Sequence, residues 1–434
     1  MKKYVKNTLA IAGLIAPLSP ALAQDVTEFS RPAIRDTHSE PPVATSPEEK
    51  ETRLTKNWGG YRTQLSNRGI DLGLIYKGHV DSLRSGGLKP GTVYSNNMDF
   101  RLAMDFEKLL GWPGGSGFFY GLFNHGGEFS SLVGDEQITN NIDAPKDIAK
   151  VYEAWVQQTF SEKRISLLAG LHDLNSEFYV TDSSTLFFNS SFGIGHELAQ
   201  TGSLGPSIFP TTSVCLRIRT EPAESFYFQV GVFNAVASEL EKSVQFRFKP
   251  SDGALVIGEL AYHSPANSDN ASPRAFKYAL GFWTYSTTSE QLLSSIDASA
   301  ESQGVSQGTY VMLNQDILER LSVFMRYGVA SSSVNPFASN LSAGIVSTGI
   351  IPSRDHDRLG LAVTQVRTGS EFRRLNEAEG KSLGNSETTY ELSYRFEAIP
   401  GLAIQPDFQW VKSPFADPNI EDAKILSARL EVSF

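Results

Sequence analysis

Apolar and polar residues alternate at every second position along most of the chain from Ile70 onward. The last ten residues show this most clearly, because their apolar positions are Leu426, Ala428, Leu430, Val432 and Phe434. Successive side chains of a β-strand point to opposite faces, so each such segment has one apolar and one polar face. One segment of this kind also fits the edge strand of a soluble sandwich, whereas many in succession favour a transmembrane barrel.

Earlier segments of the chain repeat this alternation. They lie at residues 70–77, 98–107, 214–219, 244–249, 390–397 and 402–410. A count of such segments gives about 17 candidate strands, and the number must be even if both chain ends lie in the periplasm. We therefore expect an all-β fold, namely a transmembrane antiparallel β-barrel of about 16 strands, with about 18 as the alternative. The count is open at residues 236–250 and 288–316.

The connections between these segments alternate in length. Short turns are expected at residues 162–163, 221–223, 250–253 and 399–401, and long stretches at about 127–150, 175–212, 288–304 and 369–386. Short periplasmic turns and long extracellular loops produce this asymmetry in outer-membrane barrels. A barrel of about 16 strands encloses water, so the fold would form a channel unless loops narrow it.

The beginning of the chain has the features of a secretory signal. Three lysines precede an apolar run over residues 8–18, and Ala21-Leu22-Ala23 places small residues where a signal peptidase cleaves. We expect a signal peptide at residues 1–23, with cleavage before Gln24. The proline-containing stretch at 24–54 is expected to be a disordered or extended periplasmic linker, followed by an outer-membrane barrel domain at 55–434.

Composition and charge exclude several classes of function. The formal net charge of −10 and the pI of about 5.3 argue against nucleic acid as a partner. Cys215 is the single cysteine, so no intramolecular disulfide can form. The histidines are scattered without metal-ligand spacing, and the neighbours His172 and Asp173 would point to opposite faces of a strand. We therefore expect no enzyme activity, no metal and no cofactor.

Several short motifs occur in a specific order along the chain. They lie at residues 56–62, 110–115, 154–158, 170–178, 188–192, 258–262 and 405–410. Together they resemble the carbohydrate-selective porins of the OprB type, over most of the chain from about Thr55 to Phe434. The resemblance implies an outer-membrane barrel through which sugars diffuse passively, with a pore that inward loops narrow and charged residues line.

A sugar-conducting constriction needs charged or amide groups that replace water on the sugar hydroxyls, and aromatic rings can lie against the sugar's C–H face. The alternation and the loop after residue 172 supply the candidates for lining the channel. They are Asp99, Arg101, Trp155, Asp173, Asn175, Glu177, Arg217, Arg219, Arg247, Trp283, Arg326, Glu391, Arg395, Arg429 and Glu431. In the alternative interpretation these charges pair across strands and hold the barrel's shape, and both tryptophans belong to an interfacial girdle.

Three functions are open on this basis. The first is an outer-membrane porin for passive diffusion of carbohydrates into the periplasm. The second is a general or anion-preferring porin, because Arg217, Arg219 and Arg247 suggest a region of positive potential. The third is a soluble periplasmic β-protein that binds glycans. The expected partners are small sugars, outer-membrane lipid and the barrel-assembly machinery, which would recognise the last strand ending in Phe434; the formation of homotrimers is open.

Overall fold

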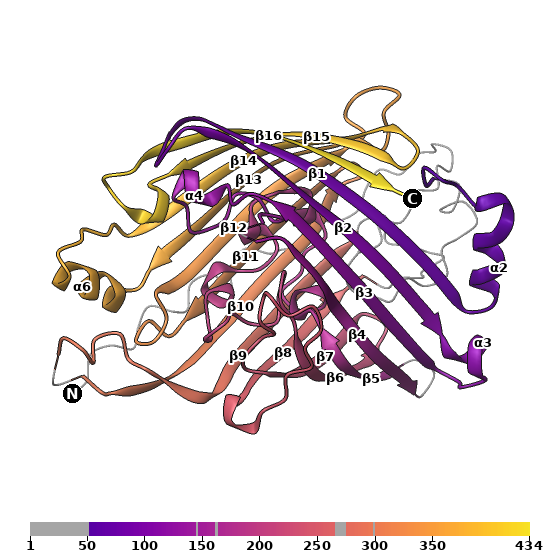
Figure 1. Cartoon of the computed structure of the whole chain (residues 1–434), viewed down its shortest axis with the longest axis horizontal. Helices are drawn as coiled ribbons and strands as arrows, with labels where there is room; N and C mark the ends of the chain where they lie inside the picture. Colours follow the sequence, from indigo (N-terminus) through magenta and orange to yellow (C-terminus); the bar gives the residue numbers. More distant parts are fainter. Residues whose placement is uncertain (1–51, 145, 161–163, 265–274, 298–299) are drawn as a thin grey trace, which may run out of the picture. The chain divides into compact units, whose positions relative to one another are not determined.

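Antiparallel strands, sixteen in the part of the chain that the structure describes, close into a barrel in this computed structural model (Figure 1). The described residues are 52–144, 146–160, 164–264, 275–297 and 300–434, so the predicted signal peptide and the linker up to residue 51 lie outside them. Each strand pairs with its neighbours in sequence, and β1 closes the barrel by pairing with β16. The prediction of a 16-strand barrel is confirmed, and an open two-sheet sandwich is excluded because the sheet closes on itself.

The strands differ in length and have the bounds β1 (Ile70–Gly87), β2 (Gly91–Asp105), β3 (Gly115–Gly126), β4 (Ile148–Phe160), β5 (Ile165–His172), β6 (Ser213–Ala223), β7 (Phe226–Asn234), β8 (Ala254–His263), β9 (Phe276–Glu290), β10 (Gln303–Leu318), β11 (Leu321–Ala330), β12 (Phe337–Thr348), β13 (Arg358–Thr368), β14 (Ser386–Ile399), β15 (Leu402–Lys412) and β16 (Glu421–Ser433). The helices are short and have the bounds η1 (Trp58–Gly60), α2 (Tyr61–Asn67), α3 (Phe106–Leu110), α4 (Ser130–Val133), η2 (Leu174–Ser176), η3 (Ser183–Leu186), η4 (Ser190–Phe192), α5 (His196–Ala199), η5 (Pro250–Asp252), α6 (Ser370–Ala378) and η6 (Pro414–Ala416). Among the described residues, no helix combines the length and the apolar character needed to cross a membrane.

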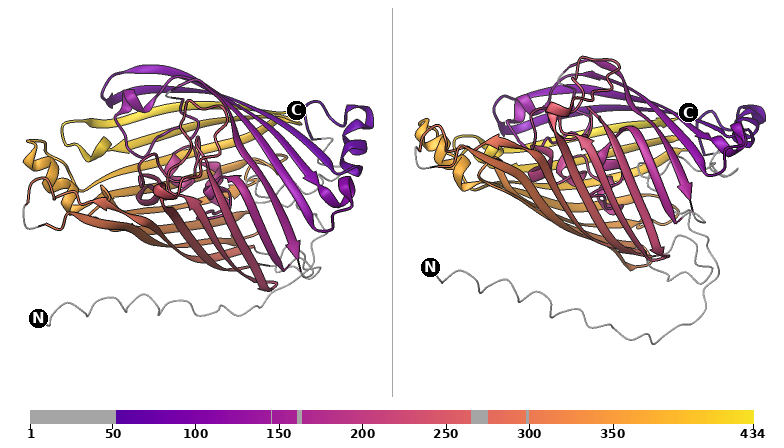
Figure 2. Two further views of the ribbon diagram at one scale, coloured as in Figure 1. Left: turned by 60° about the horizontal axis from the view of Figure 1, so that its bottom comes forward. Right: turned by 90° about the horizontal axis from the view of Figure 1, so that it is seen from below.

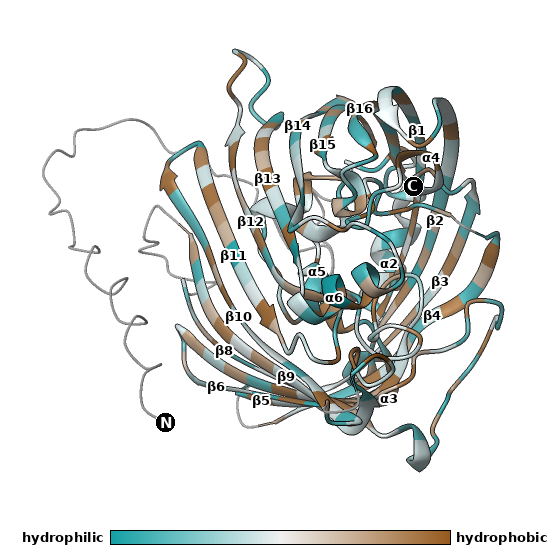
Figure 3. Ribbon diagram, turned by 90° about the vertical axis from the view of Figure 1, so that its left-hand side faces the viewer, coloured by the Kyte–Doolittle hydropathy of each residue, from teal (hydrophilic) through white to brown (hydrophobic). Residues whose placement is uncertain are grey.

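Hydrophobic and hydrophilic residues alternate along the strands, as the coloured bands in Figure 3 show. Because successive side chains of a strand point to opposite faces, one set faces the lumen and the other the outside of the barrel. On β16, Leu426 and Leu430 are 50% and 39% exposed on the outer face, whereas Arg429 is buried on the inner face. Apolar side chains exposed over the outer surface of a barrel suit a lipid environment. Val432 belongs to the outer face by its position but is buried, since its cross-strand partners Tyr76 and Leu402 lie on the same face beside it.

The two ends of the barrel domain meet at one rim. The Phe434 amide donates to the Leu74 carbonyl at 2.9 Å, so the last residue is part of the seam between β1 and β16. At the same rim the Leu54 amide donates to the Ser433 carbonyl at 2.8 Å, and Arg53 Nη1 donates to the Leu72 carbonyl at 2.7 Å. The described end of the predicted linker is therefore held against the barrel.

The tight turns agree with prediction at some positions and differ at others. β14 ends at Ile399 and β15 begins at Leu402, which confirms the turn at 399–401. β6 continues through Ala223, so the turn predicted at 221–223 is displaced and falls at residues 224–225. The turn predicted at 162–163 lies outside the described residues.

The largest error concerns residues 244–249, which the alternation predicts as a strand. β7 pairs directly with β8, so residues 235–253 form one loop and 244–249 belong to no strand. Pro250–Asp252 is a 3-10 turn within this loop, not a turn between two strands. The four long connections are confirmed between β3 and β4, β5 and β6, β9 and β10, and β13 and β14, at residues 127–147, 173–212, 291–302 and 369–385, of which residues 145, 298 and 299 lie outside the described part of the chain.

Candidate channel constriction

Two long loops fold from one rim into the lumen (Figure 2). We call residues 127–147 the first inner loop, of which residue 145 is not described, and residues 173–212 the second inner loop. The first connects β3 to β4, and the second connects β5 to β6. Their helices are short, so most backbone amides and carbonyls have no helical partner and need partners elsewhere. The inner face of the barrel supplies many of these partners.

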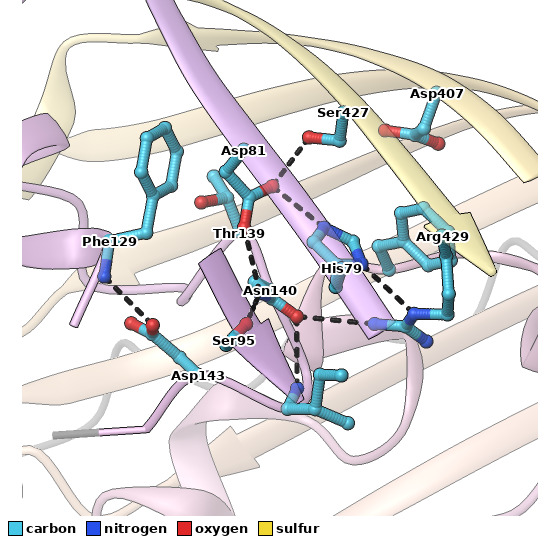
Figure 4. Close-up of polar contacts among 12 residues, drawn as sticks. His79, Asp81, Ser95, Phe129, Thr139, Asn140, Asp143, Asp407, Ser427 and Arg429 are labelled. Atoms are coloured by element: carbon cyan, nitrogen blue, oxygen red, sulfur yellow. Dashed lines mark hydrogen bonds and ion pairs between the residues drawn. The ribbon is translucent and has the colours of Figure 1, made fainter. Parts of the chain in front are cut away.

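Asn140 of the first inner loop lies at the centre of a polar network with β1, β2 and β16 (Figure 4). Its Nδ2 donates to Asp81 Oδ2 at 2.8 Å and to Ser95 Oγ at 3.0 Å, and its Oδ1 accepts from Arg429 Nη2 at 3.1 Å. Arg429 Nε also donates to His79 Nδ1 at 2.9 Å, so this imidazole carries its proton on Nε2 and donates it to Asp81 Oδ1 at 2.8 Å. The network attaches the loop to the barrel seam.

A second attachment of the first inner loop is Glu387 on β14. Its carboxylate accepts from the backbone amides of Glu136 at 2.9 Å and Gln137 at 3.0 Å. On the next strand, Gln409 Nε2 donates to the Thr139 carbonyl at 2.7 Å. The first inner loop is therefore attached to β14 and β15 as well as to the seam.

Arg326 on β11 holds the second inner loop through its backbone carbonyls. Its guanidinium donates to the carbonyls of Tyr179 at 3.1 Å, Gly193 at 2.6 Å and Ser191 at 2.6 Å. The side chain is almost fully buried, and three carbonyl dipoles replace the water that the charge loses. One wall residue thereby fixes two separate stretches of the loop.

Wall carboxylates bind the amides of the same loop. Glu391 on β14 accepts from the backbone amides of Phe188 and of Asn189, the latter at 3.0 Å, and Glu259 on β8 accepts from the Tyr179 amide at 3.0 Å. Backbone amides donate to the oxygens of these buried carboxyl groups and replace the water that burial removes. The second inner loop is therefore attached to the wall at β8, β11 and β14.

Glu177 and Arg217 form a two-pronged ion pair at the base of this loop. Arg217 Nε and Nη2 each donate to the Glu177 carboxylate at 2.7 Å. Arg217 also donates to Gln157 Oε1 at 2.7 Å and Ser166 Oγ at 2.6 Å, so its buried charge has several partners. Burial raises the pKa of Glu177, but Arg217 and the nearby His172 outweigh it and hold the pKa at about 2.

The two inner loops also bind each other inside the lumen. The Asn141 amide donates to the Phe188 carbonyl at 2.8 Å, and the Ser190 amide donates to the Ile138 carbonyl at 2.9 Å. Arg429 lies over the Phe188 ring, with 4.0 Å from its guanidinium carbon to the ring centroid. Wall, first loop and second loop therefore meet at one place and narrow the lumen there.

The structure places Asp99 and Arg101 on the inner face of β2, as predicted. Asp99 is fully buried and accepts from Tyr120 Oη at 2.6 Å and Lys77 Nζ at 3.2 Å. Arg101 keeps part of its side chain exposed, lies over the Tyr120 ring at 5.0 Å, and is 3.5 Å from Asp99. Such a cluster offers donors that a sugar hydroxyl can use, held by a carboxylate that faces no solvent.

Other predicted residues divide between holding the loops and remaining accessible. Arg217, Glu177, Arg326, Glu391 and Arg429 are buried in the attachments described above. Asp173 and Asn175 at the start of the second inner loop keep exposed surface, and Tyr152 Oη donates to Asp173 at 2.7 Å. Arg395 and Glu431 form a half-exposed ion pair at 2.9 Å nearer the rim that holds the chain's end.

Arg247 differs from its predicted position. It lies in the loop between β7 and β8 rather than on a lumen-facing strand, because residues 244–249 belong to no strand. Its Nη2 donates to Asp252 at 3.1 Å. Arg217 has Glu177 as partner, and Arg219 donates to Glu221 at 2.9 Å. All three arginines behind the anion-preferring alternative are therefore paired with carboxylates.

Trp155 and Trp283 lie on the inner side of the wall in a packed core, so neither belongs to an exposed girdle. Trp283 is 1% exposed and contacts Tyr285 edge to face, with ring centroids 6.3 Å apart. Trp155 Nε1 donates to Glu153 at 2.9 Å. In this conformation neither ring presents a face to the lumen.

Several residues that hold the inner loops were not among the sequence-derived candidates. They are His79, Asp81, Asn140, Gln137, Glu259, Glu387, Gln405 and Gln409. The alternation does place the strand residues of this set on the polar face. The sequence does not indicate which polar wall residue accepts a hydrogen bond from a loop amide. The pairing depends on how the loop folds into the lumen.

Comparison with known proteins agrees with this geometry. The sequence matches the family model of the carbohydrate-selective porins, OprB family, over residues 89–434. It is 22% identical over 422 residues to Porin B of Pseudomonas aeruginosa, covering 87% of this chain and 90% of that protein. It is also 22% identical over 289 residues to Porin AaxA of Chlamydia muridarum, covering 64% of this chain and 54% of that protein.

Solved structures share the fold. The high-pH structure of OprB from Pseudomonas putida has a TM-score of 0.79 at 21% identity, covering 88% of this chain and 98% of that one. Its low-pH structure has a TM-score of 0.57 at 19% identity, with the same coverage. The family match spans most of the chain, and the fold is the same closed barrel. The chain thus belongs to the carbohydrate-selective porins of the OprB family and is an outer-membrane porin for carbohydrates.

Proposed function

We propose that sugars diffuse through the lumen past the place where the two inner loops meet, and that Arg101, Asp173 and Asn175 contact them on their way through the lumen. The carrying observation is that these three side chains keep exposed surface, whereas Asp99 beside Arg101 is fully buried and accepts from Tyr120. A partly exposed guanidinium, carboxylate and amide can exchange hydrogen bonds with successive hydroxyls. None of them encloses the solute, which keeps binding weak enough for conduction. The proposal includes no catalytic step.

Liposome swelling tests this proposal. Vesicles containing the protein should swell faster with glucose than with amino acids of similar size. Arg101→Gln should reduce the glucose rate without lowering the conductance for KCl. Arg219→Gln is the matched control, because Arg219 lies on the lumen side but is paired with Glu221 away from the inner loops. Equal swelling rates for glucose and for amino acids of similar size would show that the channel does not select sugars.

We also propose that residues 1–23 are a signal peptide removed on export, and that residues 24–51 continue as a periplasmic linker to the held residues 53 and 54. The lysines, the apolar run and the Ala21-Leu22-Ala23 site support cleavage before Gln24. Intact-mass measurement of protein isolated from outer membranes tests this. A mature mass that begins at any residue other than Gln24 would contradict it.

A further inference from the structure

The loop between β7 and β8 carries three exposed apolar side chains. Val244, Phe246 and Phe248 are 58%, 57% and 77% exposed. The polar residues between them turn the other way: Gln245 Oε1 accepts from the Glu239 amide at 2.7 Å, and Arg247 is paired with Asp252. The alternation that predicts a strand here therefore produces an extended segment with one apolar face. We call residues 243–249 the rim segment.

The rim segment begins within the barrel wall. β5 pairs with β4 only between Ala154 and Phe160, because the chain after His172 turns into the lumen as the second inner loop. Before Ala154, β4 stays paired with β3 but has no β5 partner on its other side, and there the Val151 amide donates to the Ser243 carbonyl at 2.7 Å. Leu240, just before, packs on the inner side against a cluster that includes Ile148. The loop thus fills the gap that β5 leaves.

The rim segment begins at the height of the lipid-facing band. Phe123 is exposed on the outer face and pairs with Ala149, two residues from Val151 on β4. Leu216 and Val232 are exposed on the outer faces of β6 and β7 near the same end. β5 to β8 have only 8 to 11 residues. Because about 9–11 residues cross a bilayer, a loop that follows β7 emerges at the membrane surface.

Two cations flank the apolar triplet. Lys242 and Lys249 are exposed at either end of it, and Figure 1 shows the loop below the labels of β8 and β9, away from the other loops. An extended segment with apolar residues on one side and lysines at its ends has the composition of an interfacial anchor, in which the apolar groups enter the acyl region and the cations meet phosphates. The rim segment begins at the height of the exposed apolar residues on the outer surface of the barrel. We therefore take membrane lipid as what its apolar side chains contact.

We propose that the rim segment inserts Val244, Phe246 and Phe248 into the outer leaflet of the membrane and that Lys242 and Lys249 bind anionic lipid headgroups. The loop thereby anchors the sector of the barrel where β5 is short and the second inner loop departs. This interaction depends on the barrel and its orientation in lipid, not on which solute the channel conducts.

Depth-dependent fluorescence quenching tests the insertion. Cys215 is buried, and in a Cys215→Ala background Phe246→Cys provides a single exposed thiol for a bimane label. In proteoliposomes containing phospholipid with a nitroxide on the acyl chain, quenching at position 246 should be at least about twofold stronger than at Ser251→Cys, the control in the polar turn of the same loop. Equal quenching at both positions would overturn the proposal. Val244→Cys replaces Phe246→Cys if the latter does not give a heat-modifiable barrel.

A second measurement tests the lysines and separates lipid from a second copy of the chain. Quenching at position 246 should increase when phosphatidylglycerol replaces phosphatidylcholine, and the increase should be lost in the Lys242→Gln, Lys249→Gln double variant. Label self-quenching that grows with the protein-to-lipid ratio, without nitroxide quenching, would assign the face to a second copy and overturn the proposal. The glucose swelling rate should stay unchanged in every variant, so failure here is distinct from failure of the sugar pathway.

Discussion

Glu177 and Arg217 form a two-pronged ion pair across 40 residues of sequence, with both contacts at 2.7 Å and both side chains buried. This contact joins the base of the second inner loop to β6. Removing one partner of a buried pair leaves the other as an uncompensated charge, which is more harmful than losing the pair's net attraction.

Arg217→Gln should therefore lower the free energy of unfolding by about 3–5 kcal/mol. Thermal denaturation in detergent, followed by circular dichroism, measures this. Arg219→Gln is the matched control, since the partner Glu221 is partly exposed, and its loss should cost about 1 kcal/mol or less. Similar melting temperatures for the two variants would show that the buried pair does not stabilise the loop.

Glu391→Gln should widen the constriction. The carboxylate accepts the amides of Phe188 and Asn189, and a glutamine offers one acceptor and directs an NH2 group at the other amide. The unpaired amide favours release of the loop, so single-channel conductance in KCl should rise, by about twofold or more if residues 187–190 leave the lumen. Glu397→Gln on the same strand, where the carboxylate accepts from the Gly401 amide in a turn, should leave the conductance unchanged.

The second inner loop should open more readily as pH rises. Glu197 is buried within it, and burial raises the pKa of its carboxyl from 4.5 to about 7. Between these values the closed loop keeps a proton that an opened loop releases, so closure is most stable below pH 4.5 and weakens as pH rises through 7. Glu177, with its pKa of about 2, contributes stability that stays constant over this range.

Amide hydrogen exchange measures this loop opening. After correction for intrinsic rates, residues 193–201 should exchange faster at pH 8 than at pH 5. Glu197→Gln keeps a neutral side chain at both values and should reduce the difference, leaving the part that comes from Asp173, whose pKa burial also raises to about 7. An equal pH dependence in the variant would assign the effect to another group.

Deletion of Phe434 should impair assembly into the outer membrane. The deletion removes the hydrogen bond from its amide to the Leu74 carbonyl and the aromatic end of the closing strand. The fraction of heat-modifiable barrel in outer-membrane preparations measures the effect, with Phe434→Trp as the control that keeps an aromatic terminus. Normal levels of folded barrel in the deletion variant would contradict this role.

The strands could be predicted because a barrel strand has lipid on one side and polar surroundings on the other. Apolar and polar residues therefore alternate at every second position of the strand. Residues 426–430 follow this pattern in sequence and in exposure. The same pattern misidentifies 244–249, because alternation reports that a segment has two different faces and not that it has a partner strand. Here the partner is absent, and the chain runs along the rim.

The site could be predicted less completely than the fold. Arg101 and Arg429 face the lumen as their positions require, but one keeps exposed surface and the other is buried against Asn140 and Phe188. That distinction depends on where two loops turn inward, and loop conformation follows from many contacts distant in sequence. Glu387, which binds the first inner loop, has the same local pattern as a wall residue that binds nothing.

The paired hydrogen bonds between residues 138–141 and 188–190 make the two inner loops one mechanical unit that spans the lumen. Loosening an attachment of either loop therefore changes the position of both. Substitutions at separate attachments, such as at Asn140 of the first inner loop and at Glu391 of β14, should therefore affect conductance non-additively, although the two side chains lie on different elements. The lumen would then have two states, one in which the joined loops span it and one in which they do not. The largest solute that the channel admits would differ between these two states and would not change gradually.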